Sequence, residues 1–232
     1  MSLTRNLAML LVVGSFACGE EYAEMKGVTS HVLTDSEGNV IEVLLKMPMV
    51  HVEQLDRPAE ATVEFDQAAL EQTYVNHASI TFTEQGHVPW SLEGRPHFEV
   101  HYHGIGQDSR TAIDCEAEPK PAAERVPPDY EVSDTSAKPF GSCEVGMGVH
   151  AFDTRATDLF TGVTNMGYHD GELTFVEPMI DRDSVLAHAT VEIEIRRPAQ
   201  LGRVTRWPER FIGRYDADDT YHFALTDFTS IE

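Results

Sequence analysis

The segment Pro96-His-Phe-Glu-Val-His-Tyr-His103 alternates polar and apolar side chains after its first residue. Successive side chains of a β-strand point to opposite faces, so Phe98, Val100 and Tyr102 share one face. The opposite face carries His97, Glu99, His101 and His103. The segment therefore predicts a strand with one face for the core and another rich in metal-ligand side chains.

Period-two patterns continue on both sides of this segment. Residues 28–33 and 40–45 flank a glycine-containing turn, and 211–215 and 221–225 flank an aspartate-rich turn, so each pair predicts a hairpin. Short helices are expected at 66–71, with Asp66 as the cap, and at 107–114 and 181–188. The fold class predicted is mainly β, an antiparallel sandwich or barrel with a few short helices.

The chain of 232 residues divides into three predicted parts. Residues 1–17 combine one cation with an apolar run too short to span a bilayer, which is typical of a signal peptide. Residues 18–27 form a polar linker, and 28–232 form a single β-rich domain. Within that domain, the proline-rich stretch 115–146 predicts a long loop.

The dipeptide Ala17-Cys18 fits the end of a bacterial lipoprotein signal, although Ser15 and Phe16 fit it poorly. We expect Cys18 to be lipidated, which would hold the domain at the membrane of the bacterial cell envelope, in the periplasm or on the cell surface. The alternative is ordinary cleavage near Ala17 beside an incidental thiol.

Two cysteines remain after such processing, Cys115 and Cys143. In an oxidising compartment an even pair favours a disulfide, and the loop between them has little core of its own. The alternative is two free thiols.

The formal net charge is −22, from 17 basic and 39 acidic residues spread along the chain. A field of this sign repels nucleic acid and anionic lipid, so no nucleic-acid partner is expected. A solvated acidic surface is the simplest interpretation. The sequence contains no Gly-x-Ser-x-Gly elbow, phosphate-binding glycine loop or Cys-x-x-Cys.

The spacing of His97, Glu99, His101 and His103 leaves two interpretations open. Side chains two residues apart on one strand lie close enough to share a divalent transition metal such as Zn, Fe, Mn or Cu. Further ligands would then come from elsewhere, and His150 and Glu177 are the best candidates. Alternatively, the apolar face makes all the core contacts and the histidines lie in water.

Several segments taken together resemble a known family. They are Gly86-His-Val-Pro89, Pro96–Tyr102, Met147-Gly-Val-His150, Tyr168–Ile180 and the tail from Trp207 to Leu225. Their order is similar to that in the uncharacterised exported bacterial proteins typified by a Thermus thermophilus protein under extracytoplasmic sigma-factor control. The resemblance covers roughly 28–228 and implies a β-rich fold and export, but no activity.

The positions that match this family pattern are His87, His97, Glu99, His101, His150 and Glu177. His103 stands where the pattern has tyrosine, so it is a weaker ligand candidate, and Ala151 replaces a tryptophan that would wall a pocket. Because separate motifs supply the histidines, a shared metal site is favoured. The remaining alternative is a buried hydrogen-bond network that fixes the strands.

Three functions are consistent with these patterns. The first is a metal-binding domain in which His97, His101 and His150 converge, with Glu99 or Glu177 completing the ligand shell or orienting a ring. The second is a metalloenzyme that acts on a small molecule with the same ligands and an open position. The third is a structural surface protein that forms homo-oligomers.

Overall fold

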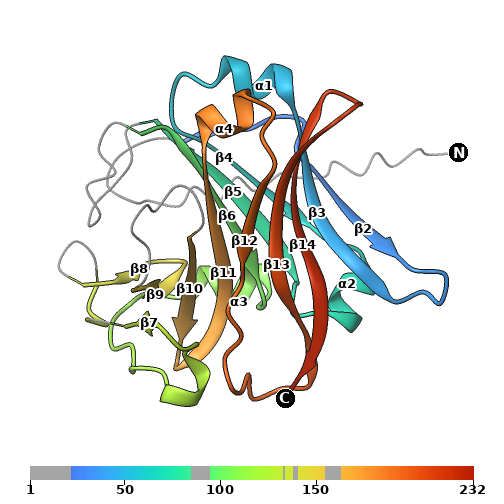
Figure 1. The fold of residues 1–232 in the computed structure, drawn as a ribbon. Coiled ribbons are helices and arrows are strands. Elements are labelled where there is room, and N and C mark those ends of the chain that lie inside the picture. Colours follow the sequence, from blue (N-terminus) through green and yellow to red (C-terminus); the bar gives the residue numbers. More distant parts are fainter. Residues whose placement is uncertain (1–21, 85–94, 133, 138–140, 155–162) are drawn as a thin grey trace, which may run out of the picture.

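A computed structural model of the chain describes residues 22–84, 95–132, 134–137, 141–154 and 163–232 (Figure 1). The predicted signal peptide, Cys18 and the first part of the predicted linker lie outside these residues, as does His87. The strands are β1 (Ala23–Glu24), β2 (Thr29–Thr34), β3 (Val40–Pro48), β4 (Ala59–Glu64), β5 (His77–Thr83), β6 (His97–His103), β7 (Tyr130–Glu131), β8 (Cys143–Glu144), β9 (Gly148–Asp153), β10 (Thr164–His169), β11 (Glu172–Asp181), β12 (Val191–Glu194), β13 (Thr205–Asp216) and β14 (Thr220–Ile231).

The described strands form two sheets. The larger follows the order β1-β4-β5-β6-β11-β10-β9-β7, with β8 also paired to β9, and the smaller follows β12-β13-β14-β3-β2. Neighbouring strands run antiparallel except β1 and β4, which are parallel. The two sheets pack face to face (Figure 1), so the mainly β prediction is confirmed in its sandwich form.

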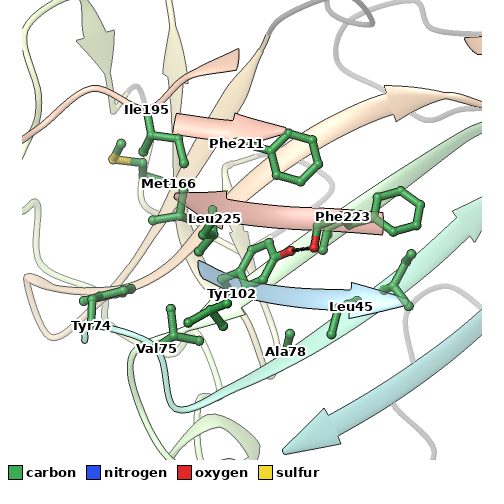
Figure 2. Packing of buried hydrophobic residues seen from close by; sticks show 14 of the residues in the cluster. Leu45, Tyr74, Val75, Ala78, Tyr102, Met166, Ile195, Phe211, Phe223 and Leu225 are labelled. Carbon is green, nitrogen blue, oxygen red and sulfur yellow. Dashed lines mark hydrogen bonds between the residues drawn. The ribbon is translucent and has the colours of Figure 1, made fainter. Parts of the chain in front are cut away.

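The core lies between the sheets and is built from the inward side chains of both (Figure 2). Phe98, Val100 and Tyr102 of β6 are fully buried there, as the alternation in the sequence predicted. The Phe98 ring lies 5.8 Å from that of Phe223 on β14. The Tyr102 hydroxyl crosses the core and donates to the Phe223 carbonyl at 2.7 Å. A strand of one sheet is thereby tied to a strand of the other.

The helices are short and lie between strands: α1 (Met49–Gln54), α2 (Gln67–Gln72), α3 (Gln107–Thr111), α4 (Arg182–Leu186) and the 3₁₀ turn η1 (Ala123–Arg125). Two of them begin after a capping aspartate, because Asp66, as expected, and Asp181 accept hydrogen bonds from backbone N–H groups of the first turn. No sequence signal pointed to α1, which lacks a side-chain cap and contacts α4 at one end of the sandwich (Figure 1).

Several boundaries differ from the prediction, and helix α4 for example ends at Leu186 and not at residue 188. Helix α3 ends at Thr111 instead of continuing to residue 114. The closing hairpin is longer than expected, since β13 and β14 pair from Thr205↔Ile231 to Asp216↔Thr220. Polar and proline residues interrupt the alternation in β13, but its pairing with β14 keeps the strand extended.

The loop at 115–146 is closed by the predicted disulfide between Cys115 and Cys143, whose Cα atoms lie 5.9 Å apart. The loop is not wholly irregular, because it includes η1, β7 and β8. None of the helices in the described residues is long and apolar enough to cross a membrane.

Candidate metal centre

The outer face of β6 is buried, although it faces away from the other sheet. His97 is 0%, His101 3% and His103 1% exposed. The interpretation that places these histidines in water is therefore wrong. Burial of polar side chains at this density requires hydrogen-bond or ligand partners, because an unpartnered buried polar group costs free energy.

The strand register brings the outer-face residues into two neighbouring rows. In one row, His77, His103, Phe175, Gly167 and His150 follow one another across β5, β6, β11, β10 and β9. In the next row, Ser79 pairs with His101 and Asn165 with Glu177. The pairs Tyr102↔Val176 and Glu99↔Met179 bracket Glu177 and place it opposite His101. Five segments of the chain thus converge on one patch of sheet.

His101, His150 and Glu177 form the centre of this patch. One potential ligand atom from each lies within 4.8 Å of the others, and all three residues are buried. The Nε2 atom of His101 is 3.3 Å from Oε1 of Glu177. Two of the three histidines expected to converge therefore do so, His101 and His150, and the candidate carboxylate Glu177 joins them.

Neighbouring groups fix the orientation of two of these side chains. Asn165 donates from Nδ2 to Oε2 of Glu177 at 3.0 Å. The Nδ1 atom of His150 lies 3.0 Å from the carbonyl oxygen of Ser142 and 3.2 Å from that of Gly148. Carbonyl oxygens only accept, so Nδ1 carries the proton. The lone pair of the neutral His150 ring is then on Nε2, the nitrogen that would bind a metal.

The Phe175 ring forms a wall between the histidines. Its centroid lies 5.1 Å from that of His101, 5.7 Å from His103 and 5.2 Å from His150, edge-on in each case. Gly167 makes room for this ring, because a Cβ at that position would lie 1.9 Å from Cε1 of Phe175. A residue without a side chain on β10 is therefore required for this packing.

Glu177 is an acid in an unusual setting, with 2% of its surface exposed. Burial acts to raise the pKa of its carboxyl group. The charge and hydrogen bond of His101 oppose this, with a smaller contribution from His150, and the net pKa lies below the ordinary value. The nearby Glu99 acts in the opposite direction. The arrangement thus favours an ionised carboxylate, provided that positive charge stands beside it.

The other predicted site residues lie around this group and not in it. His97 contacts Glu99 through Nε2 and Oε1 at 3.2 Å. The Nε2 atom of His103 lies 3.2 Å from the Ser79 hydroxyl, and its ring stacks on His77 at 4.4 Å. Burial, followed by the charge of Arg110, lowers the pKa of His77 to about 4 and holds that of His103 well below its usual value.

Ala151 does not line the site. It follows His150 on β9, so its side chain points to the opposite face, where it belongs to the buried core. The missing aromatic side chain at this position therefore affects the core and not the histidine patch.

Sequence reasoning missed the residues that position the ligands, namely Ser142, Asn165, Gly167 and Phe175. Phe175 stands two residues before Glu177, so the same alternation would have placed it on the ligand face. Asn165 and Gly167 could be placed beside the ligands only once the strand register was known. Ser142 contributes its backbone carbonyl, which every residue has, so its side chain could not indicate this role.

Two further groups of histidine and carboxylate side chains lie nearer the surface. In the first, His169 Nδ1 contacts Oε1 of Glu118 at 2.6 Å, beside Asp170. The second joins His222 to Asp216 and Asp218 on the β13–β14 turn, where Lys46 already pairs with Asp218 at 3.2 Å. Both include exposed carboxylates, unlike the His101, His150 and Glu177 group.

Searches against protein-family models, curated proteins and solved structures return no match for this chain. The resemblance to the exported bacterial family rests on sequence motifs alone and stays a prediction.

Proposed function

We propose that this chain is a metal-binding domain that holds one divalent transition metal ion through His101, His150 and Glu177. The observation that carries the proposal is the convergence of these three ligand atoms within 4.8 Å in a buried patch. The three side chains come from β6, β9 and β11, so rigid strands hold all of them. Ligands placed on a rigid sheet lose little conformational freedom when the ion binds.

The donor set suits borderline transition metals. Two imidazoles and one carboxylate are the protein ligands of many Zn²⁺ sites and of non-haem Fe²⁺ sites. An ion bound here would supply fixed positive charge beside the ionised Glu177, in place of a protonated histidine. Zn²⁺ and Fe²⁺ are therefore favoured within the wider group of Zn, Fe, Mn and Cu.

The competing interpretation is a hydrogen-bond network that only fixes the strands. Such a network is expected to use all its buried donors and acceptors. Within the described part of the chain, Nδ1 of His101 and Oδ1 of Asn165 are buried without a hydrogen-bond partner. The patch also holds two carboxylates close enough for Glu99 to affect the pKa of Glu177. The unused polar capacity of His101 and Asn165 favours a bound ligand, and the carboxylates favour a cation.

Titration with Co²⁺ tests this proposal, because the ion reports its coordination through visible absorption. The metal-free protein should develop d–d bands at one equivalent, and His150→Ala and Glu177→Gln should each weaken binding by at least about 10-fold. His31→Ala is the matched control, since His31 is an exposed histidine of β2. Equal binding by all four proteins, or binding by none, would contradict the proposal.

A metalloenzyme is the second candidate, because three protein ligands leave at least one coordination position for water or substrate. The test is addition of azide to the Co²⁺-loaded protein. A change in the d–d bands shows that a position exchanges with solvent and favours an enzyme. An unchanged spectrum favours a closed binding site.

We further propose that the domain works outside the cytoplasm on a lipid anchor at Cys18. The Cys115–Cys143 disulfide supports an oxidising compartment, and the signal-like segment 1–17 supports export. Inhibition of the lipoprotein signal peptidase should cause the precursor to accumulate. Normal processing in its presence, or a Cys18→Ser protein that is cleaved and released equally well, would count against the anchor.

A further inference from the structure

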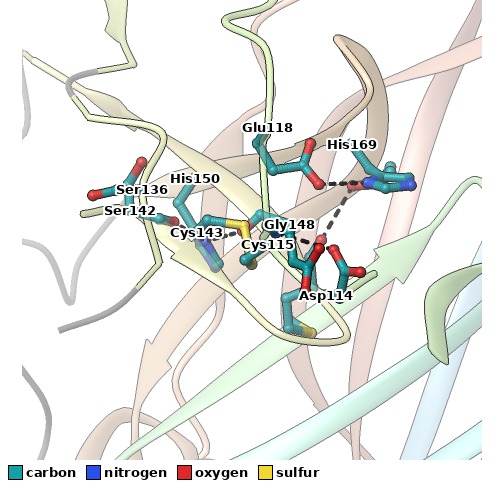
Figure 3. Close-up of a disulfide and its surroundings, with 12 residues drawn as sticks. Asp114, Cys115, Glu118, Ser136, Ser142, Cys143, Gly148, His150 and His169 are labelled. Atoms are coloured by element: carbon teal, nitrogen blue, oxygen red, sulfur yellow. Dashed lines mark hydrogen bonds and ion pairs between the residues drawn. A yellow bond between two sulfur atoms is a disulfide. The ribbon is translucent and has the colours of Figure 1, made fainter. Parts of the chain in front are cut away.

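The disulfide lies one residue from the group that orients His150. Ser142 precedes Cys143, and its carbonyl oxygen accepts two hydrogen bonds from His150 (Figure 3). One comes from the His150 backbone N–H and the other from Nδ1 of the ring, both at 3.0 Å. The position of this carbonyl therefore fixes both the backbone and the ring of a candidate metal ligand.

The segment that carries this carbonyl pairs with the sheet through β9. Strand β8 is two residues long and pairs with β9 at Cys143↔Val149 and Glu144↔Gly148. The Ser142 N–H donates to Asp134 at 2.8 Å and the Cys143 N–H to Ser136 at 3.0 Å, and both acceptors belong to the same loop. The covalent link to Cys115 ties the segment instead to the chain that follows α3.

Two hydrogen bonds join the same two segments close to the disulfide. The Gly146 N–H donates to the Ile113 carbonyl at 2.9 Å, and Nε of Arg110 donates to the Gly146 carbonyl at 3.0 Å. Cys115 is 6% and Cys143 0% exposed, so a reductant reaches the bond when the loop opens. The disulfide is thus the covalent link between the segment that follows α3 and the segment that orients His150.

We propose that the Cys115–Cys143 disulfide sets the metal affinity of the centre through the Ser142 carbonyl, so that reduction weakens metal binding. This inference rests on the proposed metal-binding function. A dithiol supplies the two electrons and two protons, the S–S bond breaks to give two cysteine thiols, and the dithiol becomes a disulfide. Loss of the link loosens β8, and His150 loses the acceptor that fixes its tautomer and orientation. Loss of such an outer partner typically weakens metal affinity by about 10–100-fold.

Co²⁺ titration of the oxidised and reduced protein tests the inference. The protein is reduced with excess dithiol, freed of it by gel filtration under argon, and titrated beside the oxidised form and a Cys115→Ser/Cys143→Ser variant. The double variant contains neither disulfide nor thiol, so it removes thiol coordination as an explanation. Glu118→Gln is the matched control, because it removes the charge from the loop's contact with His169 at 2.6 Å and leaves the disulfide in place.

The expected result is a Kd for Co²⁺ about 10-fold or more higher in the reduced protein and the double variant, unchanged in Glu118→Gln, and restored by reoxidation. Equal affinity in the oxidised and reduced forms would overturn the inference while leaving the metal site intact. Loss of near-UV circular dichroism on reduction would also overturn it, because the disulfide would then be a general stabiliser. Absence of Co²⁺ binding by the oxidised protein would instead remove the proposed function itself.

Discussion

The two faces of strand β6 are buried to nearly the same extent but are built from opposite chemistry. The inner face presents Phe98, Val100 and Tyr102 to the second sheet. The outer face presents three histidines and a glutamate to the side that the second described sheet does not cover. The inner face gains free energy from burial, whereas the outer face must find a polar partner for every group that it hides. We infer that burial of the inner face stabilises the fold, whereas the outer face serves the proposed metal binding.

The largest effect on stability is expected for truncation of a side chain on the inner face, and its absence would contradict this comparison. Phe98→Ala removes a fully buried ring that contacts Phe82 and Phe223, so we expect a loss of about 3–5 kcal/mol in the free energy of unfolding. The outer-face change His103→Phe keeps a ring against His77 and should cost no more than about 1 kcal/mol at pH 7. Urea unfolding of both variants measures the difference. Equal losses would show that the two faces do not differ in this way.

A smaller change tests whether the outer face is packed as tightly as the core. Gly167→Ala places a Cβ against the Phe175 ring, which must then move from its position between the three histidines. Overpacking of this kind typically costs about 1–3 kcal/mol. The same variant should bind Co²⁺ more weakly, because Phe175 contacts both His101 and His150. Unchanged stability together with unchanged Co²⁺ affinity would mean that the position of the Phe175 ring matters neither for the fold nor for metal binding.

Low pH should destabilise the protein by protonating the buried histidines of the outer face. The pKa of His77 is lowered to about 4 by burial and by Arg110, and that of His103 is lowered for the same reasons. The unfolded chain binds protons at these histidines near pH 6.5, whereas the folded chain resists them, so stability falls as pH decreases from about 6.5 towards 4. The lowered pKa of Glu177 adds a loss at more acidic pH, as this carboxylate is protonated.

Urea unfolding of the metal-free protein as a function of pH measures this slope. His103→Phe removes one of the neutral buried histidines and should flatten the curve between pH 6.5 and 4, relative to the wild type. A curve identical to that of the wild type would show that His103 is as easily protonated in the folded state as in the unfolded chain.

The smallest expected effect on stability concerns a hydrogen bond on the inner face and separates its contribution from that of ring burial. Tyr102→Phe removes the hydroxyl that donates to the Phe223 carbonyl and keeps the buried ring. One lost hydrogen bond typically costs about 1 kcal/mol, well below the cost of Phe98→Ala. Thermal unfolding followed by circular dichroism measures it. A loss as large as that of the ring truncation would mean that polar contacts, not burial, stabilise the sandwich.

Much of the fold was predictable, because strand alternation is a local property. The pattern from Pro96 to His103 predicted both faces of β6, and Asp66 predicted the start of a helix. Helix α1 was missed because it lacks a capping side chain. The disulfide followed from the small number of cysteines and the composition of the loop between them.

The site was predictable only in part, because it depends on strand register. His101, His150 and Glu177 were each identified as candidate ligands. Alternation alone could not separate His101 from His97, Glu99 and His103, which share its face of β6. The antiparallel pairing of β6 with β11 decides this by setting Glu177 opposite His101. The burial of the outer face was not predictable from the strand itself, since it depends on side chains of other strands, such as His77 and Phe175.

Elemental analysis of the purified, untagged mature domain tests the central claim most directly. The protein is exposed to a mixture of divalent transition metals, dialysed, and measured beside His101→Ala and His150→Ala. The account predicts one tightly held transition metal ion per chain in the wild type and none in either variant. A wild-type protein that retains no metal, or variants that retain as much as the wild type, would contradict it.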